Sequence, residues 1–167
     1  MEYIWSPWRY GYISSGVRRP DCVLCDVQGS GEAGREWDRR QLILYRANLN
    51  FVILNLFPYT VGHLMIVPYK HEARLSEASR DTTSEMMELA KQAQIALEAE
   101  YHPDGFNVGM NLGNAAGAGV ANHLHLHIVP RWAGDANFVS VVGETRVLAE
   151  DLATTYDKLA KHFSRTK

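Results

Sequence analysis

The segment His-Leu-His-Leu-His-Ile-Val, residues 123–129, decides the fold of this chain. Histidines alternate strictly with large apolar residues, and a period of two is typical of a β-strand that turns one face to a core. The pattern therefore predicts a strand over residues 124–129 that stops before the following proline. The imidazoles of His123, His125 and His127 would share one face at spacings of roughly 6.5–7 Å, with the leucines and isoleucine on the other.

A row of imidazoles can carry phosphoryl chemistry. A neutral imidazole, with an ordinary pKa of about 6.5, is a good nucleophile near pH 7 if one ring nitrogen keeps its lone pair. The other nitrogen should then donate its hydrogen to a fixed acceptor, often a backbone carbonyl. Two other interpretations stay open: ordinary polar side chains on a strand face, or a three-histidine metal site. The metal site is harder to build, because the outer rings on a flat strand lie about 13–14 Å apart.

The rest of the chain predicts an α+β fold with an antiparallel sheet and helices packed on one face. Short apolar segments bounded by turn residues are typical of strands. Such segments lie at residues 42–46, 51–54, 62–68 and 106–111, with residues 47–50 closing a hairpin.

Apolar residues at spacings of three and four predict helices. The first begins at Asp81, where Thr82 and Glu85 fit a capping box, and ends before Pro103. A second, amphipathic helix is expected over residues 147–163. Glycines and charges at residues 27–40 favour a loop.

Composition excludes several kinds of protein. The chain has 167 residues, a formal net charge of −2 and no apolar segment near the roughly 20 residues that span a bilayer. We therefore expect one domain with no affinity for nucleic acid or membranes. The N-terminus lacks the layout of a secretory signal, and the two cysteines form one C-x-x-C, so we expect a cytoplasmic protein without a structural disulfide.

Within the single domain, residues 1–167, three parts are distinguished by composition. Residues 1–40 form an N-terminal extension with the cysteine pair, residues 41–140 the core, and residues 141–167 the C-terminal helix. The extension begins with closely spaced tyrosines and tryptophans at residues 3–12. These rings would either pack on the domain or a partner, or line a ligand pocket.

A glycine-rich segment, NLGNAAGAGVAN at residues 111–122, directly precedes the histidine segment. Glycines let a backbone approach a ligand closely and present N–H groups to phosphate oxygens. Such loops are common, and the position beside the histidines is what makes this one a candidate phosphate site.

These motifs together resemble the histidine triad family. The resemblance extends over nearly the whole chain, and its latter part and the opening WSPWR are similar to a bacterial group near the fragile histidine triad and diadenosine tetraphosphate phosphorylase branches. The matching stretches are CVLC at 22–25, NLFPYTVGHLMIVPYKH at 55–71, the glycine-rich segment, HLHLHIV, and residues 130–156.

The resemblance implies a homodimeric enzyme that cleaves nucleoside phosphate derivatives at the α-phosphorus through a nucleotidyl-histidine. The middle histidine, His125, would be the nucleophile, and His127 would hold the phosphate. Ile53 and Leu54 would border the base, and Asn55 would bind the ribose. The phosphates would lie along a set of loop positions: Asn111, Gly117, Ala118 and Gly119.

One departure from the family matters. Many members carry Gln or Ser shortly before the triad, where this chain has Gly-Ala-Gly-Val-Ala at residues 117–121, so no side chain there can assist the leaving group. Hydrolysis and phosphorolysis of dinucleoside polyphosphates such as diadenosine tetraphosphate, the latter with inorganic phosphate as acceptor, both stay open. The alternatives are a nucleotide-binding regulatory module with little turnover and a nucleoside phosphoramidate hydrolase.

The C-x-x-C pair allows a redox, packing or metal role. By analogy with zinc-bearing members of the family, Cys22 and Cys25 would join His71 and His123 in a structural zinc site, since zinc accepts this ligand set and four protein ligands leave no open position. His63 is the rival for the place of His71.

Overall fold

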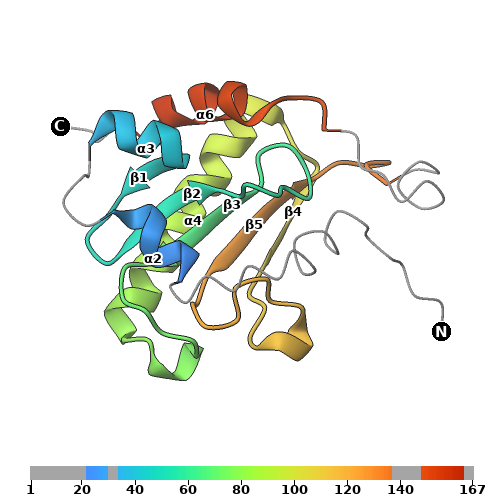
Figure 1. Ribbon diagram of the computed structural model, residues 1–167. Coiled ribbons are helices and arrows are strands. Elements are labelled where there is room, and N and C mark those ends of the chain that lie inside the picture. Colours follow the sequence, from blue (N-terminus) through green and yellow to red (C-terminus); the bar gives the residue numbers. More distant parts are fainter. Residues whose placement is uncertain (1–21, 30–33, 137–147, 164–167) are drawn as a thin grey trace, which may run out of the picture.

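The computed structural model describes residues 22–29, 34–136 and 148–163, and its centre is a five-stranded antiparallel sheet (Figure 1). The strand order is β1-β2-β3-β5-β4, and every neighbouring pair is antiparallel. The α+β prediction is confirmed. The strands are β1 (Ile43–Arg46), β2 (Asn50–Leu54), β3 (Leu64–Pro68), β4 (Gly105–Gly109) and β5 (Leu126–Arg131).

Strand β5 lies further along the chain than the alternation predicts. It begins at Leu126, after His123 and His125, and it continues through Pro130 to Arg131. Strand β3 pairs with β5 only as far as Ile128, so beyond that residue β4 is the one described partner strand of β5. The missing N–H of Pro130 therefore breaks no hydrogen-bond ladder on the β3 side, and the proline is tolerated.

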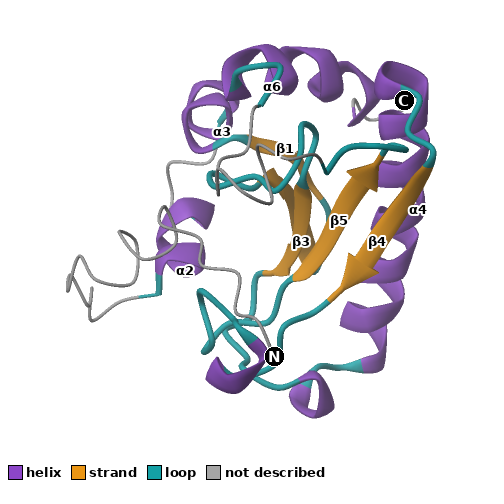
Figure 2. Cartoon of the chain, turned by 90° about the vertical axis from the view of Figure 1, so that its right-hand side faces the viewer, coloured by secondary structure: helices purple, strands orange, loops and turns teal. Residues whose placement is uncertain are grey.

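One face of the sheet is covered by the long helix α4 (Arg80–Tyr101) together with α6 (Leu152–Ala160), and Figure 2 shows α4 running along the strands. Leu126 and Ile128 point into this layer and are almost fully buried, as the alternation predicts. They belong to a cluster that α4 lines with the side chains of Met86, Leu89, Ala90, Ala93, Ala96 and Leu97.

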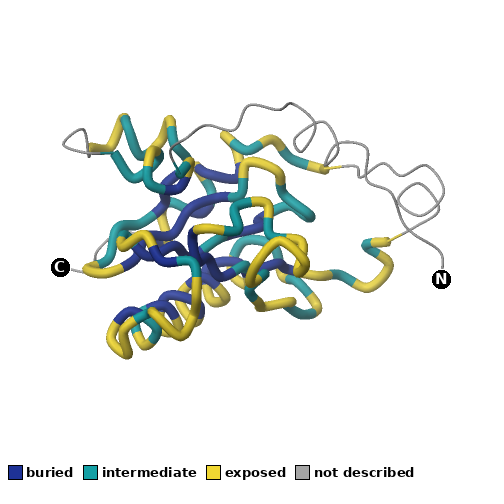
Figure 3. The backbone as a smooth tube through the Cα atoms, turned by 60° about the horizontal axis from the view of Figure 1, so that its bottom comes forward, coloured by how far each residue is buried: buried dark blue, intermediate teal, exposed yellow. Residues whose placement is uncertain are grey.

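The opposite face carries a smaller apolar cluster and the short helix α2 (Val23–Gln28). Leu24 of α2 packs there with the side chains of Phe51 and Val67 from the central strands. Figure 3 shows buried segments at the centre of the molecule, with intermediate and exposed segments around them. The histidines lie on this second face.

The N-terminus of α4 differs from the predicted capping box. The helix begins at Arg80, and its N-cap is Ser79, whose side-chain oxygen accepts the Thr82 N–H at 3.0 Å. Glu85 instead accepts hydrogen bonds from the backbone N–H groups of Asn48 and Leu49, at 3.0 and 2.8 Å. The carboxylate that the sequence assigned to a cap therefore fastens the β1–β2 turn to the helix.

The prediction of a loop at residues 27–40 is wrong in part. Helix α2 reaches Gln28, and helix α3 (Arg35–Gln41) follows Gly34. Acidic residues in the first turn of α3 and arginines in its last turn complement the helix dipole, and the helix itself contains no glycine.

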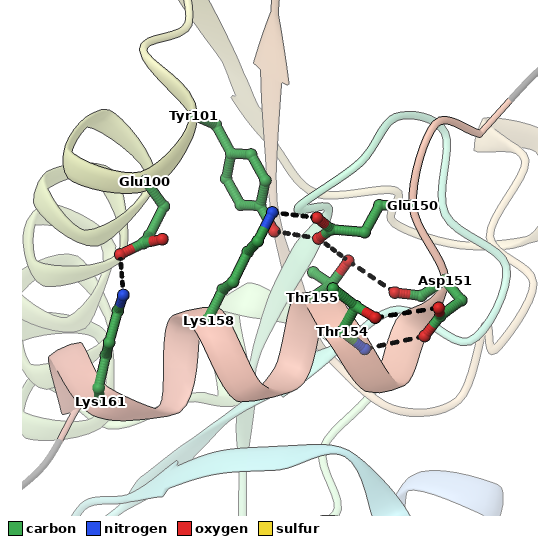
Figure 4. A network of polar contacts seen from close by, with 8 residues as sticks. All are labelled: Glu100, Tyr101, Glu150, Asp151, Thr154, Thr155, Lys158 and Lys161. Carbon is green, nitrogen blue, oxygen red and sulfur yellow. Dashed lines mark hydrogen bonds and ion pairs between the residues drawn. The ribbon is translucent and has the colours of Figure 1, made fainter.

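The C-terminal helix is shorter than predicted. Asp151 is the N-cap of α6, and a 3₁₀ turn (Lys161–Phe163) follows its last residue, so the described part of residues 148–151 is not helical. Glu150, just before the cap, accepts hydrogen bonds from Tyr101 Oη at 2.6 Å and Thr155 Oγ1 at 2.9 Å and is paired with Lys158, which ties α6 to the end of α4 (Figure 4).

Some predictions lie outside the described residues, among them the aromatic segment at residues 3–12 and residues 141–147 of the expected C-terminal helix. None of the helices in the described ranges combines the length and the apolar character that a bilayer crossing requires.

Candidate active site and metal centre

A continuous row of side chains crosses the second face of the sheet and ends at His127. Ile53 of β2 is paired with Met65 of β3, Met65 with His127 of β5, and His127 with Gly109 of β4. Paired residues of neighbouring strands share one face. On the β3 side of His127 the row is apolar. On the β4 side it is open, because a Cβ placed on Gly109 would meet nothing within 4 Å.

Leu54, predicted to border the base beside Ile53, lies on the other face. It is 2% exposed and packs in the cluster under α4. Successive residues of a strand point to opposite faces, so both cannot contact one ligand. The prediction for Leu54 is therefore wrong in its face, whereas Ile53 stays a predicted base residue, with Met65 as its neighbour on the row.

His125 has the arrangement expected of a nucleophile. Its Nδ1 lies 2.8 Å from the carbonyl oxygen of His123. A carbonyl only accepts, so Nδ1 carries the hydrogen and Nε2 keeps its lone pair. Burial lowers the pKa of His125 below its ordinary value more than this hydrogen bond raises it, which favours the neutral ring.

The tautomer of His127 follows from a chain of contacts. Nδ1 of His63 accepts the Tyr59 N–H at 3.1 Å, so the hydrogen of a neutral His63 is on Nε2. That Nε2 lies 3.0 Å from Nδ1 of His127, which must accept it. His127 therefore carries its hydrogen on Nε2 and can donate to an anion. The rings of His125 and His127 lie edge to face at a centroid distance of 4.8 Å.

His63 is the functional residue that sequence reasoning misjudged. The sequence allows His63 as a metal ligand in place of His71, but the structure buries its side chain beside His127. The cysteines instead lie near His71 and His123. The one signal in the sequence was that His63 directly precedes the apolar segment that forms β3. The pairing of β3 with β5 could not be read from the sequence.

Asn55 lies beside the same ring. Its Nδ2 is 3.3 Å from Nδ1 of His63, and its Oδ1 accepts the Phe57 N–H at 3.0 Å. The predicted ribose residue is thus held in the β2–β3 loop, next to the ring of His63 that contacts His127.

The glycine-rich segment folds over the second face. It contains one 3₁₀ turn (Asn114–Ala116), and the next residue, Gly117, has a positive φ of 80° that favours glycine. Val120 packs on the cluster that includes Ile53. Of the predicted phosphate residues, Asn111 and Ala118 are half-buried, whereas Gly117 and Gly119 are exposed.

A second cluster brings all four predicted metal ligands together. One donor atom from each of Cys22, Cys25, His71 and His123 lies within 4.8 Å of the others. Nδ1 of His123 is 3.2 Å from Cys22 Sγ, and Nδ1 of His71 is 3.2 Å from Cys25 Sγ. Helix α2 positions the thiols through its first turn, in which the Cys25 N–H donates to the Cys22 carbonyl at 2.9 Å.

The donor set fits a divalent metal ion of tetrahedral preference. Donors around such an ion lie about 3.3–3.8 Å apart for zinc. Nε2 of His123 lies 2.9 Å from the Pro68 carbonyl oxygen, so Nε2 carries the hydrogen and Nδ1 presents its lone pair to the thiols. Burial, and then the neighbouring Cys22, raise the pKa of Cys25 to about 11, so the sulfur of Cys25 is a thiolate near neutral pH only beside a cation.

The fold and the two clusters define an α+β protein with a buried neutral imidazole, a second imidazole that donates, and a Cys₂His₂ set that could hold a metal ion. A family model for the HIT domain matches residues 38–134. An AP-4-A phosphorylase from Mycobacterium tuberculosis is 36% identical over 167 residues, which is 99% of this chain and 86% of that protein.

Solved structures agree with this match. A Zn-bound histidine triad family protein from Mycobacterium smegmatis is 26% identical with a TM-score of 0.67, over 87% of this chain and 94% of that one. A histidine triad nucleotide-binding protein from Sulfolobus tokodaii is 26% identical with a TM-score of 0.63, over 85% and 89%. The chain belongs to the HIT domain family.

Proposed function

We propose that the protein cleaves dinucleoside polyphosphates, with diadenosine tetraphosphate as the model substrate, at the α-phosphorus through a nucleotide bonded to His125. The observation that carries this proposal is the hydrogen bond from His125 Nδ1 to the His123 carbonyl, which leaves Nε2 as a nucleophile on a buried, neutral ring. The name of the M. tuberculosis relative, AP-4-A phosphorylase, supports the substrate class.

In the first step His125 Nε2 attacks the α-phosphorus, an N–P bond forms, and the P–O bond to the remaining phosphates breaks, so that ATP leaves. Nε2–H of His127 would donate to a phosphoryl oxygen and stabilise its developing charge. In the second step the oxygen of inorganic phosphate or water attacks the same phosphorus, which breaks the N–P bond and yields ADP or AMP.

Ile53 and Met65 would support the base, because they extend the apolar row away from His127. Asn55 would bind the ribose, and Asn111 with the Gly117–Gly119 backbone would lie along the phosphates. Backbone N–H groups are the donors left for this task, since the side chains of residues 117–121 have none.

The Cys₂His₂ set would hold a structural zinc ion. The donor set supports zinc, as does the Zn-bound relative from M. smegmatis. The metal would cross-link α2 to the sheet, and four protein ligands leave no position for substrate. Metal-site thiols persist in a reducing compartment, which supports a cytoplasmic location.

A homodimer is the proposed assembly. Strand β4 is at the sheet edge, none of the described strands pairs with its outer side, and Val108 on it is 51% exposed. An unpaired edge favours pairing with another chain. Light scattering should give twice the chain mass, and a monomer at micromolar concentration would exclude this assembly.

The test of the activity uses diadenosine tetraphosphate with and without inorganic phosphate. ADP formed only with phosphate identifies a phosphorylase, and AMP plus ATP identifies a hydrolase. His125→Ala should abolish turnover while nucleotide binding survives. The alternative, a nucleotide-binding regulatory module, is favoured by the missing Gln or Ser, and it predicts nucleotide binding with equally low turnover in both forms.

A further inference from the structure

The surface beyond His127 on the same face carries one cation that the proposed function does not use. In β5, His127, Val129 and Arg131 point to the same face, because alternate residues of a strand do so. Their partners on β4 are Gly109, Asn107 and Gly105. The β4 side of this surface is open, since a Cβ on either glycine would meet nothing within 4 Å and Asn107 is exposed, whereas Val129 itself is buried.

The guanidinium of Arg131 is held back toward His127. Its Nη1 donates to Asn107 Oδ1 at 2.7 Å. Asn107 is paired with Val129, which lies two residues nearer to His127 along β5 than Arg131 does. Nε and Nη2 donate to the Asp135 carboxylate at 2.5 and 2.7 Å. His127 and Arg131 are two pairs apart, about 13–14 Å along the strand, and the guanidinium reaches back beside Asn107, so a chain of several phosphates that begins at His127 can meet it.

The route of the leaving group along β5 is set by what lies on this face. Nδ1 of His125 is bound to the His123 carbonyl, so Nε2 is the nitrogen that can attack. In phosphoryl transfer the attacking and leaving atoms are roughly in line. A leaving group that departs past His127 along β5 meets Arg131, because both side chains lie on the same face of that strand.

We infer that Arg131 binds the departing polyphosphate and thereby determines specificity for dinucleoside polyphosphates over substrates with small leaving groups. The guanidinium has five N–H donors in a planar fork, which suits phosphate oxygens. The side chain of Arg131 is 44% exposed, so a substrate can reach the guanidinium without unfolding the sheet edge. Asn107 and Asp135 act as positioning residues that fix the fork before substrate arrives.

The inference rests on the proposed function, and two substrates separate the failure of one from the failure of the other. Diadenosine tetraphosphate loses a triphosphate, whereas adenosine 5′-phosphoramidate loses only ammonia from the same α-phosphorus. Arg131→Ala should lower kcat/KM for the tetraphosphate about 10- to 100-fold, the usual worth of a charged hydrogen bond, and leave kcat/KM for the phosphoramidate unchanged.

Arg131→Lys keeps the charge without the fork and should fall between wild type and alanine. Arg39→Ala is the matched control, because Arg39 makes a comparable exposed pair with Asp157 between α3 and α6 and contacts neither cluster. Circular dichroism and thermal melts show whether each variant folds.

Equal losses on both substrates, or no loss on either, would overturn the inference about Arg131 and leave the proposed function intact. A wild-type protein that cleaves only the phosphoramidate would overturn it together with the proposed substrate class. A wild-type protein that cleaves neither substrate would refute the proposed function itself.

Discussion

His123 and His125 stand two residues apart, yet the structure gives them opposite surroundings. His123 donates through Nε2 to the Pro68 carbonyl and turns Nδ1 to the cysteines, in a cluster whose four donors face one another. His125 donates through Nδ1 to the His123 carbonyl and keeps Nε2 for a ligand. In both residues, the backbone carbonyl that one ring nitrogen binds decides what the other nitrogen can do.

The two clusters are joined by one residue. The ring of His123 belongs to the metal set, and its carbonyl fixes the tautomer of His125. A metal site that orders residue 123 therefore also orders the nucleophile, although it has no open position for chemistry.

The largest expected effect comes from removing one cysteine of the Cys₂His₂ set. Cys25→Ser and Cys22→Ser each remove one of four donors, and bound zinc should fall from about one equivalent to less than about a tenth. Because metal binding contributes to folding, the melting temperature should fall by about 10 °C. Elemental analysis and calorimetry measure both. Full metal content in either serine variant would mean that the four donors do not form the site.

The two sheet faces give the next test. Leu54→Ala empties a position in the core under α4 and should destabilise the protein by about 2–5 kcal/mol without changing KM. Met65→Ala alters the half-buried row beside His127 and should mainly raise KM. Denaturant titration and steady-state kinetics separate the two. The assignment of faces fails if Leu54→Ala raises KM and Met65→Ala does not.

The contact between His63 and His127 can be removed without changing the nucleophile, His125. His63→Ala removes the donor that fixes the tautomer of His127, so kcat should fall about 10- to 100-fold with little change in metal content. His63→Gln can still donate from its amide and should recover part of the rate. A merely structural role predicts no recovery by glutamine beyond its effect on the melting temperature.

The smallest expected effect lies away from both clusters. Burial raises the pKa of Glu150, but bonds from Lys158, Tyr101 and Thr155 outweigh it and hold the pKa below the ordinary value of 4.5. Such a carboxylate stabilises the fold above pH 4.5, and its contribution is lost as the pH falls through the lowered pKa.

Glu150→Gln should therefore lower the melting temperature by about 2–4 °C at neutral pH, the effect of about 1 kcal/mol, and the difference from wild type should shrink in acid. Zinc content and kcat should stay at wild-type values. A melting difference that grows in acid would reverse the sign of this argument.

Much of this could be predicted from the sequence, for reasons that particular residues make plain. The alternation of HLHLHIV places Leu126 and Ile128 in the core, and the C-x-x-C spacing fits one helical turn. Contacts between distant segments could not be predicted, because they depend on strand order. The pairing of Met65 with His127 therefore came only from the structure, as did the contacts of His63 and the face of Leu54.

Nucleotide transfer through His125 is tested most directly by mapping the covalent adduct. Enzyme mixed with diadenosine tetraphosphate in the absence of inorganic phosphate is quenched in alkali, which spares phosphoramidates, and digested for mass spectrometry. The account predicts one adenylyl group on the peptide that contains His125, attached to that ring, and none in His125→Ala. An adduct on His127 or His63, or full turnover by His125→Ala, would contradict it.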